Sequence, residues 1–311
     1  MREITVLTHR RPEDTTPALR RLGVQAAAVG VTLRLDEEET RKHRLVAAPG
    51  IELDAPIKDD VELCVVLGGD GTILRALQRY AGTSVPVFAF NFGEIGFLAT
   101  VEPRDLEDGM RRALDGAFEL LRLPAIVLEE ASGGSSLAQA QVGGESLDPR
   151  TARPPVDVSG IEDGRMAIND VAIHRKVGER VAELAYALEG EEVGSVRCDG
   201  LVVATPAGST GYNLANGGPV MAWGVEGFVV SFIAPHSLTA RALVVAPGDR
   251  LTIHNRSREP LDIAVDGRPA GEIPAGETID ARFVNDIGTI AQLAGSSFYR
   301  RLREKFGRLA S

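Results

Sequence analysis

Residues 62–72 read ELCVVLGGDGT, an apolar run followed by a turn with three glycines in four positions. Glycine removes the Cβ atoms that would stop a backbone from approaching a phosphate or a ribose, and it permits a positive φ. After the turn, apolar residues recur at helical spacing, which predicts a helix with a core-facing stripe at Ile73, Leu74, Leu77 and Tyr80. The turn is therefore expected at the carboxyl end of a buried strand, where open α/β sheets bind ligands and where helix N–H groups can meet an anion.

Asp70 is the unusual member of this turn. A plain strand-to-helix turn would account for the glycines alone. A carboxylate among phosphate-facing amides would repel a phosphate, so Asp70 needs a metal ion or a substrate hydroxyl as its partner. The combination points to phosphoryl transfer.

The first 125 residues alternate short apolar runs with helical patterns, at 4–7, 62–67 and 85–91 among the apolar runs. This rhythm is typical of a parallel sheet covered by helices, and it predicts a Rossmann-like α/β domain over 1–124 plus 286–311. Apolar residues at helical spacing predict one helix between Pro103 and Gly116, with Gly116 as its C-cap, and a terminal helix over 297–309 that returns to the first domain.

From about residue 125 the pattern changes to short β-like segments with hairpin punctuation, and it predicts a mainly antiparallel β domain over 125–285. The expected strands are 183–188, 201–205, 228–233, 243–245, 251–254 and 261–265. The fold class is therefore α/β plus β. Residues 129–165 are rich in Gly, Ser, Ala and Pro and lack apolar periodicity, so we expect a partly mobile insertion there.

Composition narrows the class of protein. The chain has 311 residues, 44% of them hydrophobic and 25% charged, and no apolar run reaches the roughly 18 residues of a membrane span. A net charge of −10 argues against broad binding to nucleic acid or acidic membranes, which a positive field holds. The start of the chain reads as a first strand and not as a signal peptide, so we expect a cytoplasmic protein. Cys64 lies in an apolar run and is expected to be core packing.

Several motifs follow one another in a fixed order along the chain. They are GGDGT (68–72), NFGEIGFL (91–98), ND (169–170), DG (199–200) with TPAGSTGY (205–212) and GGP (217–219), and PHSL (235–238). With these motifs the sequence resembles the bacterial NAD kinases over nearly its whole length, apart from 129–165. The first motif alone is weak, because lipid kinases and phosphofructokinases have similar turns.

The resemblance implies an enzyme that transfers the γ-phosphoryl group of ATP to the 2′-hydroxyl of the adenosine ribose of NAD, giving NADP. It implies Mg²⁺ or another divalent cation delivered with ATP, and a homodimer or homotetramer. We expect no metal site of the protein itself, because His236 has no second candidate ligand at a fixed spacing. In this family pattern Asp70 accepts or steers the hydroxyl proton, Asn169 and Asp170 hold a ribose diol of NAD, and Asp199 faces the nicotinamide end. The other positions that match substrate contacts are Gly69, Gly71, Thr72, Asn91, Phe92, Arg180, Arg197, Thr210, Gly211, Tyr212, Ala215 and Arg268.

The sequence also departs from the family pattern. Asp170 replaces the usual Glu, and Ala207, Gly211, Ala215 and Arg268 stand where Thr, Ala, Ser and Gln are common. Taken alone, Asn169-Asp170 is equally an Asx turn at a strand start, Asp266-Gly267 a hairpin turn, and each arginine a solvated surface group. Two other functions stay open: a lipid or sugar kinase that shares only the glycine-rich turn, and a nucleotide-binding regulator without turnover.

Overall fold

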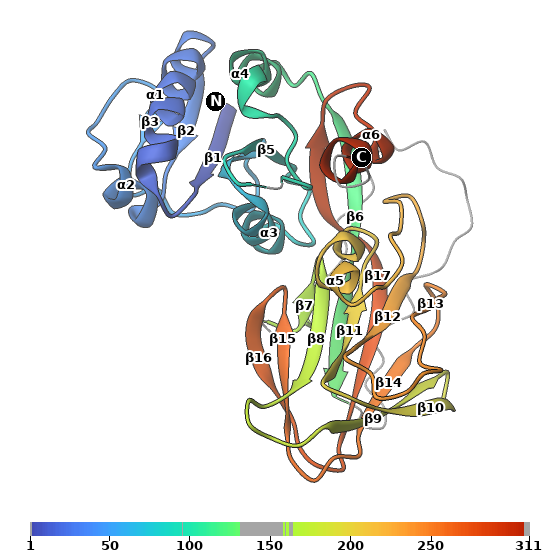
Figure 1. Ribbon diagram of the computed structural model, residues 1–311. Coiled ribbons are helices and arrows are strands. Elements are labelled where there is room, and N and C mark those ends of the chain that lie inside the picture. The colour runs from blue at the N-terminus through green and yellow to red at the C-terminus, as the bar shows by residue number, and fades with distance from the viewer. Residues whose placement is uncertain (1, 95, 131–157, 159, 162–163, 308–311) are drawn as a thin grey trace. The chain divides into compact units, whose positions relative to one another are not determined.

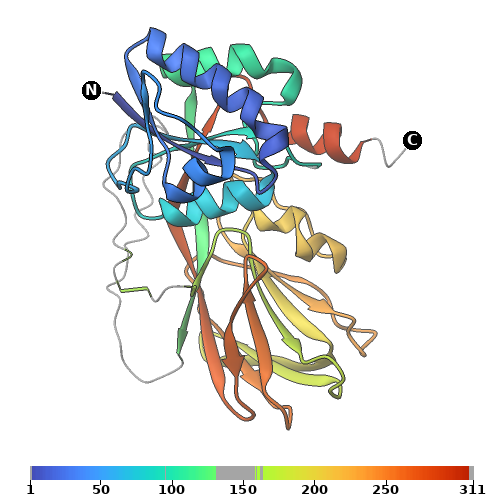
Figure 2. The ribbon, with the colours of Figure 1, turned by 90° about the vertical axis from the view of Figure 1, so that its left-hand side faces the viewer.

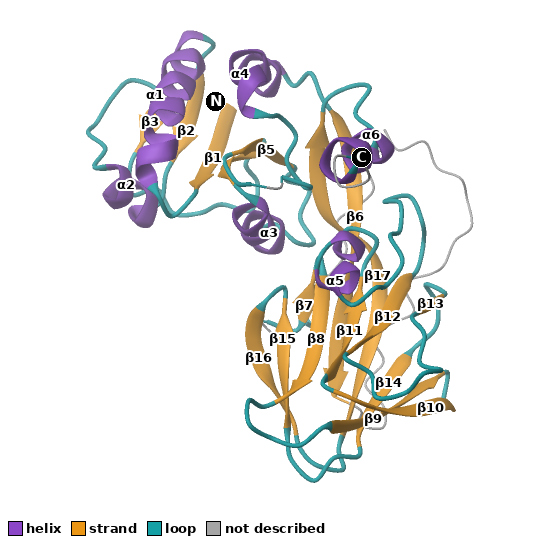
Figure 3. Ribbon diagram, in the orientation of Figure 1, coloured by secondary structure: helices purple, strands orange, loops and turns teal. Residues whose placement is uncertain are grey.

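A computed structural model describes residues 2–94, 96–130, 158, 160–161 and 164–307. The chain divides into two compact units. The first contains the described residues of Met1–Arg122 and Gly288–Ser311, and the second those of Leu123–Ser146 and Asp157–Ile287. Figure 3 shows most of the helices in the first unit and mostly strands in the second. Among the described residues, no helix is long and apolar enough to cross a membrane.

The first unit is built on a parallel sheet with the strand order β5-β4-β1-β2-β3 (Figure 1). Its strands are β1 (Arg2–Thr8), β2 (Val31–Arg34), β3 (Ile51–Glu52), β4 (Leu63–Gly68) and β5 (Val87–Asn91). The strand β4, between β5 and β1, is buried along its whole length because helices cover both faces of the sheet. Cys64 lies in this strand and is fully buried, which confirms its expected place in the core.

Helices α1 (Pro12–Ala28) and α4 (Leu106–Asp115) cover one face of this sheet, and α2 (Glu37–His43) and α3 (Asp70–Arg79) cover the other (Figure 2). A short 3₁₀ turn, η1 (Pro103–Asp105), leads into α4. The helix α4 ends at the predicted C-cap, Gly116, whose φ of 70° is the left-handed conformation that glycine adopts without cost. The core between α1, α4 and the sheet includes Ile4, Leu19, Leu22, Val65, Met110 and Leu114.

The terminal helix α6 (Phe298–Phe306) belongs to the first unit, as predicted. The ring of Phe306 packs 5.2 Å, centroid to centroid, from the ring of Phe97. Ser297 caps the helix by accepting a hydrogen bond from the backbone N–H of Arg300. The end of the predicted stripe, Leu309, lies outside the described residues.

The second unit consists of antiparallel strands in two sheets. One sheet has the order β13-β12-β11-β8-β15-β16, and the strands of the other that lie in this unit follow the order β10-β9-β14-β17, with β6 paired to β17 and β7. The first sheet contains β8 (Asp170–Arg175), β11 (Gly200–Ala204), β12 (Phe228–Ile233), β13 (Leu243–Val245), β15 (Leu261–Val265) and β16 (Arg268–Ile273). The other contains β6 (Glu119–Glu130), β7 (Met166–Ala167), β9 (Ala182–Leu188), β10 (Glu191–Cys198), β14 (Leu251–Asn255) and β17 (Thr278–Gln292).

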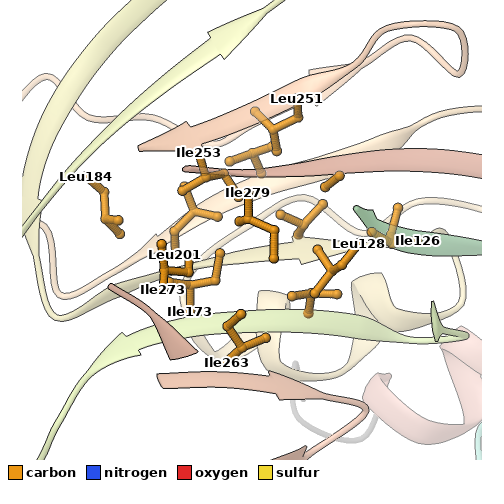
Figure 4. Packing of buried hydrophobic residues seen from close by; sticks show 14 of the residues in the cluster. Ile126, Leu128, Ile173, Leu184, Leu201, Leu251, Ile253, Ile263, Ile273 and Ile279 are labelled. Atoms are coloured by element: carbon orange, nitrogen blue, oxygen red, sulfur yellow. The ribbon is translucent and has the colours of Figure 1, made fainter. Parts of the chain in front are cut away.

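Alternate side chains of these strands form one core (Figure 4). In β14 and β15 every second residue is buried, the pattern of a sheet with one face inside. The strand β11 is buried on both faces, because Val202 and Ala204 pack on its outer side against Met221. Residues 205–221 are therefore anchored on the sheet directly after β11.

The predicted fold class, α/β plus a mainly antiparallel β part with a returning terminal helix, is confirmed. Of the predicted insertion at 129–165, residues 129–130 end β6, and most of the rest lies outside the described residues.

Candidate active site

The glycine-rich turn lies at the carboxyl end of β4. Gly68 is the last residue of that strand, Gly69 is the N-cap of α3, and α3 begins at Asp70. The N–H groups of Thr72 and Ile73 donate to the carbonyl oxygen of Gly69 at 2.9 and 3.1 Å, which closes the first helical turn. A Cβ on Gly68 would lie 2.7 Å from the side chain of Thr72, so a larger residue at position 68 would displace that side chain.

A second turn, after β5, packs against the first through bare backbone. A Cβ on Gly93 would lie only 2.8 Å from the Cα of Gly69, and a Cβ on Gly69 would lie 3.1 Å from the Cα of Gly93. Asn91, which is 3% exposed, orders this second turn: its Oδ1 accepts from the N–H of Gly93 at 3.0 Å and its Nδ2 donates to Glu102 at 3.0 Å. The Asn91 amide thus already has partners inside the protein, and Phe92 packs on the core of the first unit.

Asp70 is held by two backbone amides from a distant part of the chain. Its Oδ2 accepts from the N–H of Phe97 at 3.1 Å, and its Oδ1 accepts from the N–H of Leu98 at 2.9 Å. The side chain is half-buried, and the neighbouring Gly71 is exposed. Apart from Gly71 itself, its chain neighbours and the backbone of its own helix, no heavy atom of the described residues lies within 4 Å of the place that a Cβ of Gly71 would take. The Asp70 carboxylate is oriented, and the residue after it borders open space.

Arg301 of α6 fixes the segment that holds Asp70. Its guanidinium donates to the carbonyl oxygen of Phe97 at 2.9 Å and to that of Ala99. Burial lowers the pKa of Arg301, and the carboxylates of Glu102 and Asp70 act in the opposite direction. Sequence analysis missed Arg301 because the contact spans more than 200 positions along the chain.

In the second unit, Asp170 begins β8, Asn169 directly precedes the strand, and another carboxylate binds the backbone of both residues. Asp266 accepts from the N–H groups of Ile168 at 2.9 Å, Asn169 at 2.7 Å and Asp170 at 3.1 Å. Asp266 and Gly267 have φ values of 47° and 75° and form the hairpin turn between β15 and β16 that the Asp-Gly pair predicted. The sequence did not reveal the second role of Asp266, the clamp on residues 168–170.

Asp170 is only 8% exposed, and its pKa is raised to about 7. Burial is the main cause, the charge of Asp266 adds to it, and a hydrogen bond from the backbone N–H of Tyr212 opposes both. The Oδ1 of the neighbouring Asn169 is buried, and no group in the described part of the chain donates a hydrogen bond to it. A buried acceptor of this kind costs free energy unless a ligand or a water molecule donates to it.

The loop after β11 packs tightly against the same pair. A Cβ on Gly208 would lie 2.0 Å from the carbonyl oxygen of Asn169. The Oγ1 of Thr205 donates to the carbonyl oxygen of Ile168 at 2.6 Å and accepts from the N–H of Gly208 at 3.1 Å. Asn213, fully buried, donates to the carbonyl oxygens of Ser209 and Pro219. The loop is therefore a rigid wall beside Asp170 and not a flexible connection.

Four predicted residues lie on this loop. Thr210 ends η2 (Gly208–Thr210), Gly211 follows it, and Tyr212 and Ala215 lie on α5 (Tyr212–Ala215). Thr210 is half-buried and donates to the carbonyl oxygen of Ala207 at 3.1 Å, whereas Gly211 and Tyr212 are exposed. A Cβ on Gly211 would lie 3.5 Å from the Oδ2 of Asp170, so Gly211 borders the carboxyl group. Ala215, which is exposed, ends α5.

Other predicted residues lie elsewhere in the second unit. Asp199, in the turn between β10 and β11, accepts from the Nε of Arg175 at 2.6 Å, and this hydrogen bond holds the pKa of Asp199 below its usual value. The same guanidinium donates to the carbonyl oxygen of Glu179, next to the exposed Arg180. Arg197 on β10 and Arg268 at the start of β16 are exposed. Arg175 was not predicted, since one arginine in an ordinary strand carries no sequence signal.

The residues around Asp70 and the residues around Asp170 lie in two regions that match known protein families. The chain matches the family model of the ATP-NAD kinase N-terminal domain at residues 24–118 and that of the ATP-NAD kinase C-terminal domain at residues 168–283. The first match contains the turn that carries Asp70, and the second contains Asp170 and Asp266. The class of protein is therefore a phosphotransferase that acts on a nucleotide.

Individual relatives narrow this class. The NAD kinase of Gemmatimonas aurantiaca is 31% identical over 98% of this chain and 95% of its own length. The NAD kinase of Bifidobacterium longum subsp. infantis is 32% identical over 98% of this chain and 82% of its own length. The chain belongs to the NAD kinase family.

Solved structures agree at the level of the fold. Yeast NADH kinase complexed with NADH has a TM-score of 0.79 at 21% identity, with 100% of this chain and 89% of that chain covered. An NAD kinase from Archaeoglobus fulgidus in complex with ATP has a TM-score of 0.68 at 22% identity, with 100% and 99% covered.

Proposed function

We propose that this enzyme transfers the γ-phosphoryl group of ATP to the 2′-hydroxyl of the adenosine ribose of NAD, which yields NADP and ADP. The observation that supports this most directly is the Asp70 carboxylate, which two backbone amides orient next to the open space at Gly71. Glycine within a helix costs roughly 0.5–1 kcal/mol relative to alanine. Because the packing of the described residues does not require a glycine at position 71, close approach of a substrate is a reason for it.

In the proposed reaction the 2′-oxygen forms a bond to the γ-phosphorus, and the bond from that phosphorus to the bridging oxygen of ADP breaks. Asp70 accepts the proton that the hydroxyl loses. A positioned carboxylate suits this role, because phosphoryl transfer asks the protein mainly to place the reactants and to stabilise charge.

Asn169 and Asp170 are proposed to bind the dinucleotide. The unpartnered Oδ1 of Asn169 and the nearly buried carboxyl of Asp170 offer acceptors to a pair of hydroxyl groups. Gly69, Thr72, Phe92, Arg180, Arg197, Asp199, Thr210, Tyr212, Ala215 and Arg268 remain proposed substrate contacts. Asn91 is proposed to act through the turn that it orders.

Mg²⁺ delivered with ATP would neutralise charge on the β- and γ-phosphates during transfer. Among the described residues, no three His, Cys, Asp or Glu side chains gather as a metal site would require. We therefore propose that phosphate oxygens and water provide most of the ligands of this ion, as is usual for Mg²⁺ in kinases.

The test is direct. The purified protein is incubated with NAD, ATP and Mg²⁺, and NADP is measured with a dehydrogenase that accepts only NADP. We expect NADP in the complete mixture and none without ATP. Parallel reactions with NADH and with inorganic polyphosphate define the acceptor and the donor. Phosphorylation of diacylglycerol without NADP formation would contradict the proposal, and so would an inactive protein that still binds both nucleotides.

Assembly and location are a further part of the proposal. We propose a homodimer or homotetramer in the cytoplasm, as the resemblance to bacterial NAD kinases implies. Light scattering coupled to size-exclusion chromatography measures the number of subunits. A monomer at concentrations at which the enzyme is fully active would contradict the oligomer.

A further inference from the structure

Asp266 binds three consecutive backbone N–H groups, and the proposed reaction does not by itself require this contact. One carboxylate at the tip of the β15–β16 hairpin accepts N–H groups from three consecutive residues, 168–170, nearly 100 positions away in the sequence. Oδ1 takes the N–H groups of Asn169 and Asp170, and Oδ2 takes that of Ile168. Charge-assisted hydrogen bonds of this kind are about twice as strong as neutral ones. The peptide planes that carry Asn169 and Asp170 are thereby fixed.

The clamp also brings two carboxyl groups together. Asp170 is 8% exposed, and the negative charge of Asp266 raises its pKa further than burial alone. Among the described residues, the other groups brought to Asp170 are uncharged: β11 opposes it with Ala204, and the following loop contributes the N–H of Tyr212 and Gly211. Burial is thus the main cause of the raised pKa of Asp170, and Asp266 is the charged neighbour that raises it further.

We propose that Asp266 is a positioning residue of the NAD site, which holds the backbone of 168–170 so that Asn169 and Asp170 face the ligand and which makes the binding of NAD depend on pH through Asp170. This inference rests on the proposed function, because it takes Asn169 and Asp170 to be ligands of NAD. Asp266 acts through these two residues and is not itself given a contact with NAD.

The sign of the pH dependence follows from the chemistry of the carboxyl group. An ionised Asp170 offers two acceptor oxygens to a pair of hydroxyl groups, whereas the protonated form has to donate one hydrogen. NAD should therefore bind more tightly as the pH rises through the pKa of Asp170, about 7. Removing the charge of Asp266 lowers that pKa, so the change in affinity should move to lower pH.

The central variant is Asp266→Asn. Asparagine tolerates the left-handed conformation at this position, where φ is 47°, so the hairpin can still form. It provides one acceptor oxygen instead of two, so at least one of the three N–H groups loses its partner. Loss of one such bond predicts a roughly tenfold rise in the dissociation constant of NAD above pH 8, with little change for ATP.

The matched control is Asp262→Asn. Asp262 lies on the same hairpin and carries the same charge, but its carboxylate points to Lys176 at 4.0 Å. It should leave both the affinity for NAD and its pH dependence unchanged. A second variant, Asp170→Asn, cannot ionise and should bind NAD with an affinity that does not vary between pH 6 and pH 8.

The experiment is calorimetric titration of each variant with NAD from pH 5.5 to pH 8.5, with circular dichroism to verify folding and NADP formation by the wild type as a separate measurement. We expect the midpoint of the wild-type change near pH 7 and that of Asp266→Asn at lower pH. If Asp266 had only a structural role, Asp266→Asn would bind NAD more weakly, but the pH midpoint of the change in affinity would stay at its wild-type value. The inference would be overturned if the pH midpoint for NAD affinity were the same in Asp266→Asn as in the wild type. It would also be overturned if Asp266→Asn bound NAD with wild-type affinity.

If Asp266→Asn does not fold, the pH dependence of NAD affinity in the wild type and in Asp170→Asn still tests the inference. A wild-type affinity for NAD that is independent of pH, or a pH dependence that Asp170→Asn retains, would overturn the inference. The proposed function fails separately, through absence of NADP formation by the wild type.

Discussion

Replacing Asp70 with Asn removes the proposed proton acceptor while changing little else in the turn. The wild-type carboxylate accepts one N–H on each oxygen, from Phe97 at 3.1 Å and from Leu98 at 2.9 Å. Asparagine has the same shape but a single acceptor oxygen, so it can keep one of these bonds and places an NH₂ group against the other N–H. The perturbation is the loss of one charge and of one hydrogen bond.

The two losses have different magnitudes in different measurements. Asp70 is half-buried, so the N–H left without a partner can reach water, and the free energy of unfolding should fall by about 1 kcal/mol. General-base assistance is worth about 10²- to 10⁴-fold in rate, so kcat should fall at least about a hundredfold. A large kinetic effect with a small effect on stability is thus the expected signature.

The assay is steady-state NADP formation at saturating NAD, ATP and Mg²⁺, together with thermal melting with and without NAD. NAD should still raise the Tm of Asp70→Asn, because binding survives. Asp59→Asn is the matched control: Asp59 is an exposed carboxylate that accepts from Arg79 at the end of α3, at 2.8 Å, and an exposed pair of this kind is worth about 0–1 kcal/mol. If Asp70→Asn kept most of its kcat, Asp70 would be a positioning residue, and another group would have to accept the proton.

Four further substitutions test the remaining parts of the site. Gly71→Ala should leave the free energy of unfolding unchanged or raise it by up to about 1 kcal/mol, because alanine is the better helix former and no described side chain obstructs its Cβ. The same variant should form NADP more slowly than the wild type. Unchanged kinetics would mean that no substrate approaches this residue. Gly93→Ala should instead lower the free energy of unfolding by about 1–3 kcal/mol in a denaturant titration, since its Cβ would lie 2.8 Å from the Cα of Gly69. Asp170 has a pKa raised from 3.8 to about 7, so the folded state binds a proton more tightly than the unfolded state, and the wild type loses stability as the pH rises through this range. Asp170→Asn should therefore have a free energy of unfolding at least about 1 kcal/mol above that of the wild type at pH 8. If this difference in the free energy of unfolding did not shrink toward pH 4, the reasoning would be contradicted. Arg301→Met removes the donors to two carbonyl groups and should lower the free energy of unfolding by at least about 1.5 kcal/mol and lower kcat through misorientation of Asp70; a folded variant with wild-type kcat would separate α6 from the site.

Local sequence determined the elements and their order. The apolar run ending at Leu67 and the helical stripe from Ile73 specify a buried strand and a helix, because each pattern matches the period of one backbone conformation. The glycines between them place the turn at the end of the strand. Asp266-Gly267 likewise specifies a hairpin, because both residues tolerate a positive φ.

The sequence also singled out Asp70, through the carboxylate in its glycine-rich turn, and the Asn169-Asp170 pair, through the resemblance to the bacterial NAD kinases. It contained no information on what holds them. Phe97 and Leu98 donate to Asp70 through their backbone N–H groups, which nearly every residue has, so nothing in the sequence marks these two residues as partners of Asp70. The roles of Arg301 and Arg175, and the clamp role of Asp266, were missed because each acts on a group that only the fold brings next to it.

Only the tertiary structure decided which groups are buried together, and therefore how they are charged and oriented. The raised pKa of Asp170 requires both its burial and the nearby charge of Asp266, and neither exists until β8 and the β15–β16 hairpin pair in one sheet. Likewise, the anchoring of residues 97–99 requires α6 to fold back on them. Secondary structure follows from patterns within a few residues, whereas desolvation and long-range hydrogen bonds depend on residues that the chain brings together from far apart.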